Sequence, residues 1–597
     1  MNEFKIKAVS MVDNRVLLEK GNKLSVENGL GNVLFLDYIL GLISHKKLKL
    51  NQEILIRSSV HKISKGEQVV LRDGDYLTLY KLLVMIINFN SNAALLSIAE
   101  FLDPSRKQPS IKVKEKRKHY GLEREAAINI TGRKMSKKQQ LYSIDDLILV
   151  GKKMVEKFQK DLAIYNASFL DYQSTIYENN SFLNIQSNVK CAYLFGLKNQ
   201  NGFILVHIHD EPVLVAVIGA RNAFHRDFIL QQAIDDMKSC PQYHETQPVV
   251  FQGTKSINFL GDTYFGEFYT NRRIKKNRKD ALICYGYDYS LDNIKDFFRR
   301  DDYNILNFEA VFVDENEKEK SWLKGQKPFL LWANQNKTMR ALSKLNLNAV
   351  SLGNNHAMDF GSQNLLETIS AFNKDNIKVF GAGKTSSNAV APIHLKINGR
   401  NIYIYSGYWY RKNAYRRYDF YTMGSSAGVA PLDAICDEIE DKKEADPNCF
   451  IIVQPHWGVD FKSILPYQVE NAEALVHSGC DLIIGHGPHT IQKVRKYREK
   501  LILYSIGNGV FNSDGEFSKY GALAYGFLTR LKFESDGAIK LILTPFNANN
   551  LETFWRPEIV NGSQFNEIIE SLKESTNYMY VDRDARQLIF NVEGGAV

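Results

Sequence analysis

The chain has 597 residues, a formal net charge of +9, and hydrophobic and aromatic shares of 44% and 12%. At about 150 residues per domain this length allows two to four domains, and we expect two large ones. The composition is that of a globular protein, and no apolar stretch reaches the roughly eighteen residues of a membrane span. The basic runs at 106–119 and 272–279 lack interleaved aromatic residues or a known module, so nucleic-acid binding is not expected.

Cysteine usage and the N-terminus indicate the compartment. The six cysteines are scattered without a C-x-x-C pair, which is typical of reduced thiols. The N-terminal segment moves into an alternating strand pattern and lacks the continuous apolar region of a secretion signal. Together these features predict a cytoplasmic protein.

Residues 1–240 predict a first domain of the α+β class. Strands come first, a helical middle follows, and two late strands cover 202–210 and 212–219 before a final helix near 226–237. The stretches 9–20, 79–102, 121–132 with 143–147, and 202–219 resemble the serine D-alanyl-D-alanine carboxypeptidases and β-lactamases.

The catalytic residues of that family are absent from this chain. By the resemblance, the S-x-x-K motif falls on 29–32, where Gly29 stands at the nucleophile position and Asn32 at the base position. The S-x-N motif falls on 90–92 and keeps only Asn92, and the K-T-G strand falls on 194–196 and keeps only Gly196. Acylation needs a hydroxyl nucleophile, so we expect a domain that is not an active serine peptidase. Peptide or γ-glutamyl binding and pure association remain as its alternative roles.

A polar, proline-containing segment then predicts a linker at 241–255, followed by a second domain at 256–597. Within the second domain, strands alternate with helical segments at 291–298, 337–345, 365–372 and 469–477, and a last amphipathic helix is expected at 564–575. This alternation predicts an α/β sheet with helices on its faces.

Polar side chains follow successive apolar strands of the second domain. Six strands end at such a cluster: 257–260, 303–306, 349–352, 450–454, 481–484 and 501–505. In the same order, the clusters contain Asp262; Asn307 and Glu309; Asn354, Asn355, His356 and Asp359; His456 and Trp457; His486 and His489; and Asn508. Because carboxyl ends of parallel strands meet at one edge of a sheet, these residues should converge. Convergent oxygen and nitrogen ligands predict a divalent transition metal site.

The same clusters resemble a known family. Gly-Asp, Asn-Phe-Glu, Gly-Asn-Asn-His, His-Trp-Gly, Gly-His-Gly-Pro-His and Tyr-Ser-Ile-Gly-Asn look like the series of the CapA-like poly-γ-glutamate capsule synthesis proteins, from about residue 255 onwards. That family is similar to the calcineurin-like metallophosphoesterases. The resemblance implies a four-layer α/β sandwich that binds one or two metals.

Roles follow from the resemblance residue by residue. It implies metal binding by six residues: Asp262, Glu309, Asn355, His456, His486 and His489. It implies that His356 protonates the leaving group or stabilises the transition state, with Asp359 orienting it. Substrate contacts are expected from Asn307, Asn354, Trp457 and Asn508. The mixed ligands suit Mn, Fe or Zn.

Three places depart from the patterns of the two families. The bridging Asp of the phosphoesterases falls where this chain has Asn307-Phe308-Glu309. Tyr264 stands where the first motif, Asp-x-His, has its histidine, and Gly487 stands where many capsule-family members have a third histidine. Fewer imidazoles leave the number of metals open, at one or two.

The reaction class also stays open at this stage. The resemblance favours synthesis or processing of γ-glutamyl amides, or of a phosphorylated or acyl-activated substrate related to them. The alternatives are a metallophosphatase acting on a small phosphoester, and a non-catalytic assembly factor that binds a peptide or polymer. A homo-oligomer or a biosynthetic partner protein is compatible with each of these functions.

Overall fold

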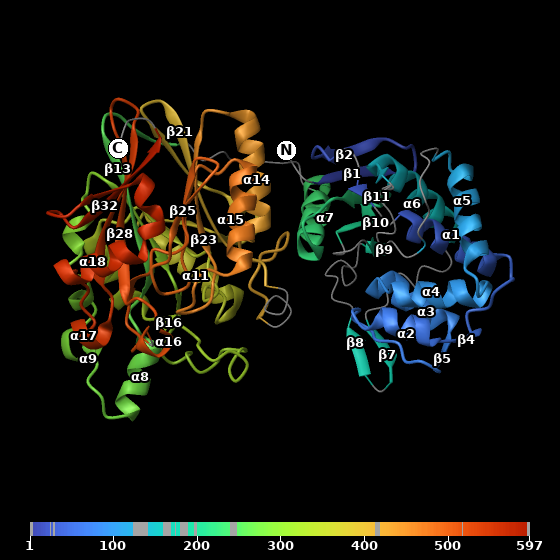
Figure 1. The fold of residues 1–597 in the computed structure, drawn as a ribbon, viewed down its shortest axis with the longest axis horizontal. Helices are drawn as coiled ribbons and strands as arrows, with labels where there is room; N and C mark the ends of the chain where they lie inside the picture. The colour runs from blue at the N-terminus through green and yellow to red at the C-terminus, as the bar shows by residue number, and fades with distance from the viewer. Residues whose placement is uncertain are drawn as a thin grey trace. The chain divides into compact units, whose positions relative to one another are not determined.

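The computed structural model of the chain describes residues 4–23, 26–27, 30–122, 130, 141–158, 169–173, 175–178, 189–195, 200–238, 248–411, 418–515 and 517–593. The chain divides into two compact units, Met1–Gln242 and Tyr243–Val597 (Figure 1). No helix in the described ranges combines the length and the apolar character needed to cross a bilayer.

The first unit is built on an antiparallel sheet of five strands in the order β2-β1-β11-β10-β9. These strands are β1 (Lys5–Ser10), β2 (Val16–Lys20), β9 (Val189–Phe195), β10 (Asn201–Ile208) and β11 (Glu211–Ile218). Side chains alternate between the two faces of a strand. Leu214, Ala216 and Ile218 accordingly belong to one apolar core, whereas Val215 and Val217 belong to another on the opposite face.

Helices supply the partners of both sheet faces. The helices of the first unit are α1 (Leu30–Ser44), α2 (Ser58–Ser64), α3 (Leu79–Phe89), α4 (Asn92–Leu102), α5 (Lys107–His119), α6 (Ile144–Phe158) and α7 (Ala223–Lys238). Helices α1, α3, α4 and α6 share the larger core, and α7 packs on the other face. Short pairs complete the unit: β3 (Val26–Glu27) with β6 (Leu141–Tyr142), β4 (Glu53–Leu55) with β5 (Tyr76–Thr78), and β7 (Phe169–Tyr172) with β8 (Thr175–Glu178).

The predicted degenerate motifs lie close together where the structure describes them. Asn32, in the first turn of α1, donates through Nδ2 to Oδ1 of Asn92 at 3.2 Å. The Ser91 hydroxyl donates to Glu67 at 2.7 Å and accepts from the backbone N–H of Ala94, as the N-cap of α4. The Ser91 oxygen is therefore occupied by capping and by a carboxylate. Gly29 and Gly196 lie outside the described residues.

We therefore expect the chain to form no covalent adduct with a β-lactam. The base position holds the amide of Asn32, which cannot activate a hydroxyl, and the Ser91 hydroxyl is already bonded to Glu67. Incubation with a fluorescent penicillin, followed by denaturing electrophoresis, should leave the chain unlabelled. A stable adduct mapped to Ser25 or Ser91 would contradict this expectation.

The second unit contains two large sheets. The ten-stranded sheet consists of β13 (Lys255–Tyr264), β14 (Tyr303–Phe308), β17 (Ala349–Ser351), β18 (Lys378–Phe380), β27 (Asn508–Phe511), β28 (Tyr525–Phe533), β29 (Ile539–Asn547), β30 (Glu558–Ile559), β31 (Met579–Asp582) and β32 (Gln587–Glu593). The seven-stranded sheet consists of β12 (Val249–Phe251), β20 (Ile393–Ile397), β21 (Arg400–Tyr408), β23 (Phe450–His456), β24 (Leu482–Ile484), β25 (Val494–Tyr497) and β26 (Lys500–Leu503). Parallel pairing runs through β18-β17-β14-β13 in the first and through β21-β23-β24-β26 in the second.

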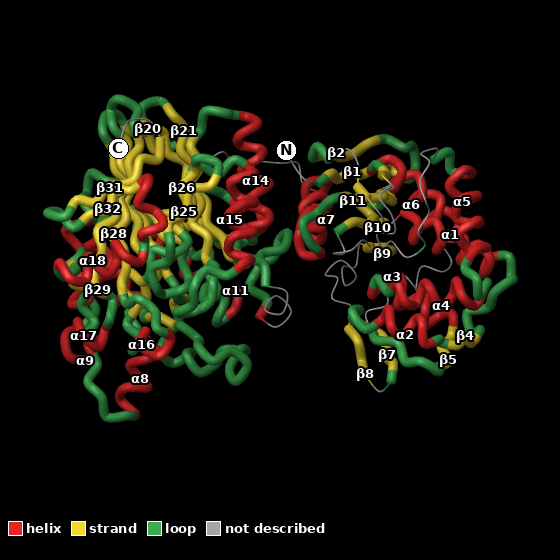
Figure 2. The backbone as a smooth tube through the Cα atoms, viewed as in Figure 1, coloured by secondary structure: helices red, strands yellow, loops and turns green. Residues whose placement is uncertain are grey.

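One apolar core joins the two sheets. It combines Ile257 and Phe259 of β13 with Ile402 and Ile404 of β21, among other residues of both sheets. The longer helices are α8 (Glu267–Lys275), α10 (Gln335–Leu342), α11 (Gly361–Lys374), α14 (Leu432–Ala445), α15 (Pro466–Ser478) and α18 (Gly562–Ser571), and the shorter ones are α9 (Ala281–Tyr285), α12 (Ser386–Val390), α16 (Phe517–Tyr520) and α17 (Asn550–Thr553). Helix α11 packs near β18, and α14 packs on β21 and on α15. Figure 2 shows the strands between helices, which confirms the predicted four-layer α/β class.

Two sequence expectations differ from the structure. The segment 291–298 is not one helix. One 3-10 turn, Asp288–Leu291, ends at its first residue and a second covers Lys295–Phe297; between them the Asn293 side chain donates to the Pro557 carbonyl. The predicted linker 241–255 also extends too far, because β12 pairs with β20 inside the second unit.

Glu267 should make the second unit less stable as the pH rises. Burial raises the pKa of this carboxyl to about 7, although hydrogen bonds from the Asn334 N–H and the Tyr287 hydroxyl stabilise its charged form. The folded state thus holds a proton that the unfolded chain loses near pH 4.5. The proton on Glu267 stabilises the folded state fully below pH 4.5. As the pH rises from 4.5 to 7, this stabilisation is lost, and the free energy of unfolding falls by about 3 kcal/mol.

The variant Glu267→Gln should lack this loss. Its free energy of unfolding relative to the wild type should increase by about 3 kcal/mol between pH 4.5 and pH 8. Urea unfolding followed by tryptophan fluorescence reports the second unit alone, because the five tryptophans are Trp322, Trp332, Trp409, Trp457 and Trp555. Parallel pH profiles for the two proteins would contradict the assignment.

Candidate metal centre

The carboxyl ends of parallel strands from both sheets supply the predicted ligands. Asp262 lies near the end of β13, Glu309 directly follows β14, and His456 is the last residue of β23. His486 and His489 follow β24. The structure places each of these five side chains within 4.0 Å of at least one other, so residues as far apart in the chain as Asp262 and His489 meet.

Asp262 is fully buried and held by two hydrogen bonds. Its Oδ1 accepts from the Asn307 amide at 2.8 Å, and its Oδ2 accepts from the Gly487 N–H at 3.1 Å. Three imidazoles surround it, with His456 Nδ1, His486 Nδ1 and His489 Nδ1 at 3.8, 3.9 and 3.3 Å.

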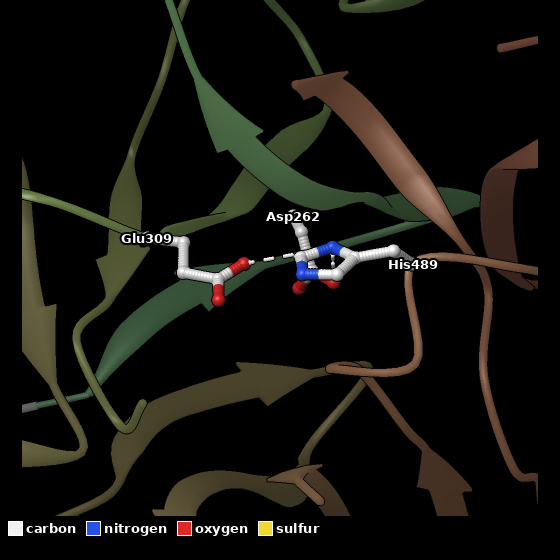
Figure 3. A group of neighbouring side chains, drawn as sticks. All are labelled: Asp262, Glu309 and His489. Carbon is white, nitrogen blue, oxygen red and sulfur yellow. Dashed lines mark ion pairs between the residues drawn. The ribbon is translucent and has the colours of Figure 1, made fainter. Parts of the chain in front are cut away.

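Glu309 forms the second carboxylate of the cluster. Its Oε1 lies 3.6 Å from His456 Nε2 and 3.7 Å from His356 Nε2, and its Oε2 lies 4.0 Å from His489 Nδ1. Most of these separations are too long for hydrogen bonds, but they suit two ligands of one ion at metal distances of about 2.0–2.2 Å. Asp262, Glu309 and His489 can together offer ligand atoms within 4.8 Å of one another (Figure 3).

Electrostatics sets the two carboxylates apart. Burial would raise the pKa of Asp262, but the His489 hydrogen bond and the other imidazoles hold it well below its ordinary value. Burial and the Asp262 charge raise the pKa of Glu309 well above its ordinary value. Burial lowers the pKa of His456 to about 3 and of His486 to about 4. Burial alone would also lower the pKa of His489, but Glu309 and Asp262 raise it to about 10.

Unpartnered atoms of three candidate ligands fit a bound cation. Glu309 Oε2, Asn355 Oδ1 and His486 Nδ1 are buried and have no hydrogen-bond partner among the described residues. Leaving such atoms unpaired costs about 1–3 kcal/mol each. All three are lone-pair donors of the kind that Mn, Fe and Zn take, so the residues present fit a divalent transition metal.

Gln454 contacts the candidate ligand His486 and was not foreseen from the sequence. Its side-chain amide lies 3.0 Å from His486 Nε2, while its own Oε1 is buried without a partner. Rotating the amide by half a turn would let Oε1 accept a proton on Nε2, which leaves Nδ1 unprotonated toward Asp262. The only sequence signal is its place at a strand end, two residues before His456.

His356 and Asp359 lie together beside the cluster. His356 Nδ1 is 2.7 Å from Asp359 Oδ2, which also accepts from the Leu331 N–H at 2.8 Å. Lys327, whose side chain is 8% exposed, bonds to Asp359 and donates to the Asn355 carbonyl at 2.8 Å. Its Nζ is 3.2 Å from His356 Nδ1. Lys327 comes from a loop without a recognisable motif, and sequence reasoning missed it.

The four expected substrate contacts take different positions. Asn307 bonds to Asp262, and Asn508 Oδ1 lies 2.8 Å from His489 Nδ1, so both contact candidate ligands. The buried Asn354 amide donates to Asn307 and to the Phe308 carbonyl and accepts from the His356 N–H. Trp457 is 1% exposed and donates to the Tyr504 carbonyl. Asn354 and Trp457 thus support the surrounding loops, and their contact with a substrate stays a prediction.

The departures at Tyr264 and Gly487 have structural reasons. The Tyr264 hydroxyl donates to the Trp332 carbonyl and accepts from the Phe268 N–H, so it is not available to the cluster. Gly487 has a φ of +110°, and a Cβ there would lie 2.3 Å from the Trp457 carbonyl oxygen. A histidine cannot occupy this position without moving the loop.

Fold and site thus define an α/β unit with a buried carboxylate and imidazole cluster of metal-binding type. Residues 256–513 match the family described as bacterial capsule synthesis protein PGA_cap. The second unit contains a PGA_cap domain, and the resemblance predicted from the sequence is confirmed.

Curated relatives and solved structures add to this comparison. The chain is 27% identical over 350 residues to a PGA biosynthesis protein CapA of Bacillus subtilis, covering 57% of this chain and 82% of that protein. It is 27% identical over 297 residues to a capsule biosynthesis protein CapA of Bacillus anthracis, covering 48% of this chain and 66% of that protein. A peptidoglycan synthesis regulatory factor of Streptococcus pneumoniae has a TM-score of 0.35 at 13% identity, over 42% of this chain and 77% of that one. Penicillin binding protein 5 of Haemophilus influenzae has a TM-score of 0.35 at 12% identity, over 43% of this chain and 73% of that one.

Proposed function

We propose that the chain is a metal-dependent enzyme that forms, transfers or cleaves γ-glutamyl amide bonds of a poly-γ-glutamate-like polymer. The observation that carries the proposal is the pair of buried carboxylates, Asp262 and Glu309, surrounded by imidazoles within a PGA_cap domain. The names of the Bacillus relatives support the polymer as the substrate class.

The residues of the site suggest a division of roles. Asp262, Glu309, Asn355, His456, His486 and His489 would hold one or two divalent ions. A cation held there would supply Lewis acidity toward a carbonyl or phosphoryl oxygen and lower the pKa of a water. His356 Nδ1 is bonded to Asp359, which fixes the ring and directs Nε2 toward Glu309, where it can exchange a proton with a leaving group.

Phosphatase activity on a small phosphoester is the second candidate. The four-layer sandwich and the two carboxylates favour it, because the same arrangement suits the oxygens of a phosphoryl group. The fold alone does not choose between these reactions.

A direct comparison of substrates tests the proposal. The purified full chain, freed of metal with a chelator and then given Mn, Fe or Zn, is incubated with tri-γ-glutamate and with aryl phosphates. We expect a metal-dependent change in the γ-glutamyl peptide that exceeds turnover of the phosphates. Preference for the aryl phosphates would favour the phosphatase, and peptide binding without any metal-dependent reaction would favour a non-catalytic assembly factor.

A further inference from the structure

A cationic side chain, Arg411, lies three residues beyond the end of β21 and contacts a tyrosine that packs against the carboxylate and imidazole cluster. Strand β21 pairs in parallel with β23, so that Tyr408 lies opposite His456, and their ring centres are 5.9 Å apart. The Arg411 guanidinium donates through Nη1 to the Tyr408 hydroxyl at 3.1 Å. Arg411 is thus connected to a candidate metal ligand through a single tyrosine.

Arg411 has no acidic partner among the described residues. Its side chain is exposed. Partial desolvation lowers the pKa of the guanidinium, and the hydroxyls of Tyr408, Tyr421 and Tyr467 raise it above its ordinary value. A guanidinium has five N–H donors, and Tyr408 takes one of them. No hydrogen bond from the other guanidinium donors to a described residue is seen, so these donors can serve a ligand.

Two neighbouring aromatic residues also hold unused polar groups. Trp409 and Tyr467 stack with ring centres 3.8 Å apart and an interplanar angle of 8°. The Arg411 guanidinium carbon is 5.3 Å from the Trp409 ring centre. Trp409 Nε1 and the Tyr467 hydroxyl are buried, and in the described part of the chain neither has an acceptor for its hydrogen, although the backbone N–H of Gly458 lies against the Tyr467 oxygen. Native structures rarely leave such groups unpaired, so their presence here indicates a missing acceptor.

The chemistry of these groups defines the ligand. Guanidinium, indole N–H and phenol O–H are all donors, and a carboxylate is a group that only accepts. We infer that Arg411, Trp409 and Tyr467 form a carboxylate subsite beside the metal cluster. This inference rests on the proposed function. The subsite would hold the free α-carboxylate of a γ-glutamyl residue while the γ-amide of that residue lies at the cluster.

Binding measurements on the purified full chain test the subsite. Calorimetric titration compares tri-γ-glutamate with the same peptide carrying α-carboxamides, and chromatography after each run checks that the peptide is intact. The wild type should bind the carboxylate form about tenfold more tightly, the typical worth of a charge-assisted hydrogen bond. Arg411→Gln should bind both forms equally, with unchanged metal content.

Three further variants sharpen the test. Arg411→Lys keeps the positive charge but loses the paired N–H donors of the guanidinium. It should therefore retain only part of the tenfold preference of the wild type for the carboxylate form. Trp409→Phe keeps the stacking ring, removes the N–H, and should lose a smaller factor. Arg340→Gln, which neutralises an exposed arginine on α10, should bind as the wild type does.

The outcomes separate this inference from the proposed function. Tight binding of tri-γ-glutamate by both the wild type and Arg411→Gln would overturn the subsite and leave the proposed function standing. Arg411-dependent binding without metal-dependent turnover would support the subsite and count against the proposed reaction. Failure of the wild type to bind either peptide would overturn both. Arg411-dependent preference for a phosphopeptide over the carboxylate form would overturn the carboxylate assignment.

Discussion

Asp262→Asn protein should lose its metal and its activity while remaining folded. Asp262 is the carboxylate that three imidazoles approach within 4 Å, and against the effect of burial they hold its pKa well below its ordinary value. Asparagine keeps the size of the side chain but removes the negative charge. Loss of an outer partner of a metal site already costs about 10–100-fold in affinity, and loss of this direct ligand should cost more.

Elemental analysis and tryptophan fluorescence together check this prediction. Metal content should fall below about a tenth of the wild-type value, with the fluorescence spectrum unchanged. Asp481→Asn is the matched control, because Asp481 is a buried carboxylate just before β24, at the strand end opposite His486, where it pairs with Lys443 and Lys500. Full metal retention in Asp262→Asn would contradict the ligand assignment, and equal loss in Asp481→Asn would show that the loss reports unfolding.

The sequence predicted the parallel half of the second unit but not its antiparallel half. Strands β13, β14, β17, β23 and β24 are buried on both faces, and their continuous apolar runs were recognisable. The hairpin β28–β29 and the strands β31 and β32 widen one sheet beyond the predicted pattern. A signal was present, since Asp536-Gly537 between two alternating runs is typical of a hairpin turn.

For the site, strand ends indicated which residues converge but not which way each side chain points. His456 and Trp457 are neighbours, yet His456 faces the cluster and Trp457 donates to the Tyr504 carbonyl in the core. Lys327 and Arg411 come from loops, whose path depends on packing that no short motif records. The convergence of carboxylates and imidazoles was therefore predictable from the sequence, whereas the groups that would orient and select a substrate were not.

His356→Ala protein should keep its metal and lose roughly 10²–10⁴-fold in turnover, the usual worth of a positioned proton donor. His356 is 7% exposed, its Nδ1 is held by Asp359, and its Nε2 lies 3.7 Å from Glu309. Asn355→Ala should instead weaken metal binding, because it removes the unpartnered amide oxygen. Elemental analysis of the two variants separates a proton donor from a ligand.

Leaving-group dependence then identifies the step in which His356 acts. A nitrophenolate leaves without needing a proton, so the loss in His356→Ala should shrink for nitrophenyl substrates and be largest for alkyl ones. Asp359→Asn keeps the shape of the residue but weakens its hold on Nδ1, and should show the same dependence with a smaller loss. If His356→Ala loses metal as readily as Asn355→Ala, or slows good and poor leaving groups equally, then His356 is a ligand or a structural residue. His356 Nε2 lies about as far from Glu309 as His456 Nε2 does, at 3.7 and 3.6 Å, so a ligand role is the main alternative that these measurements must distinguish from proton donation.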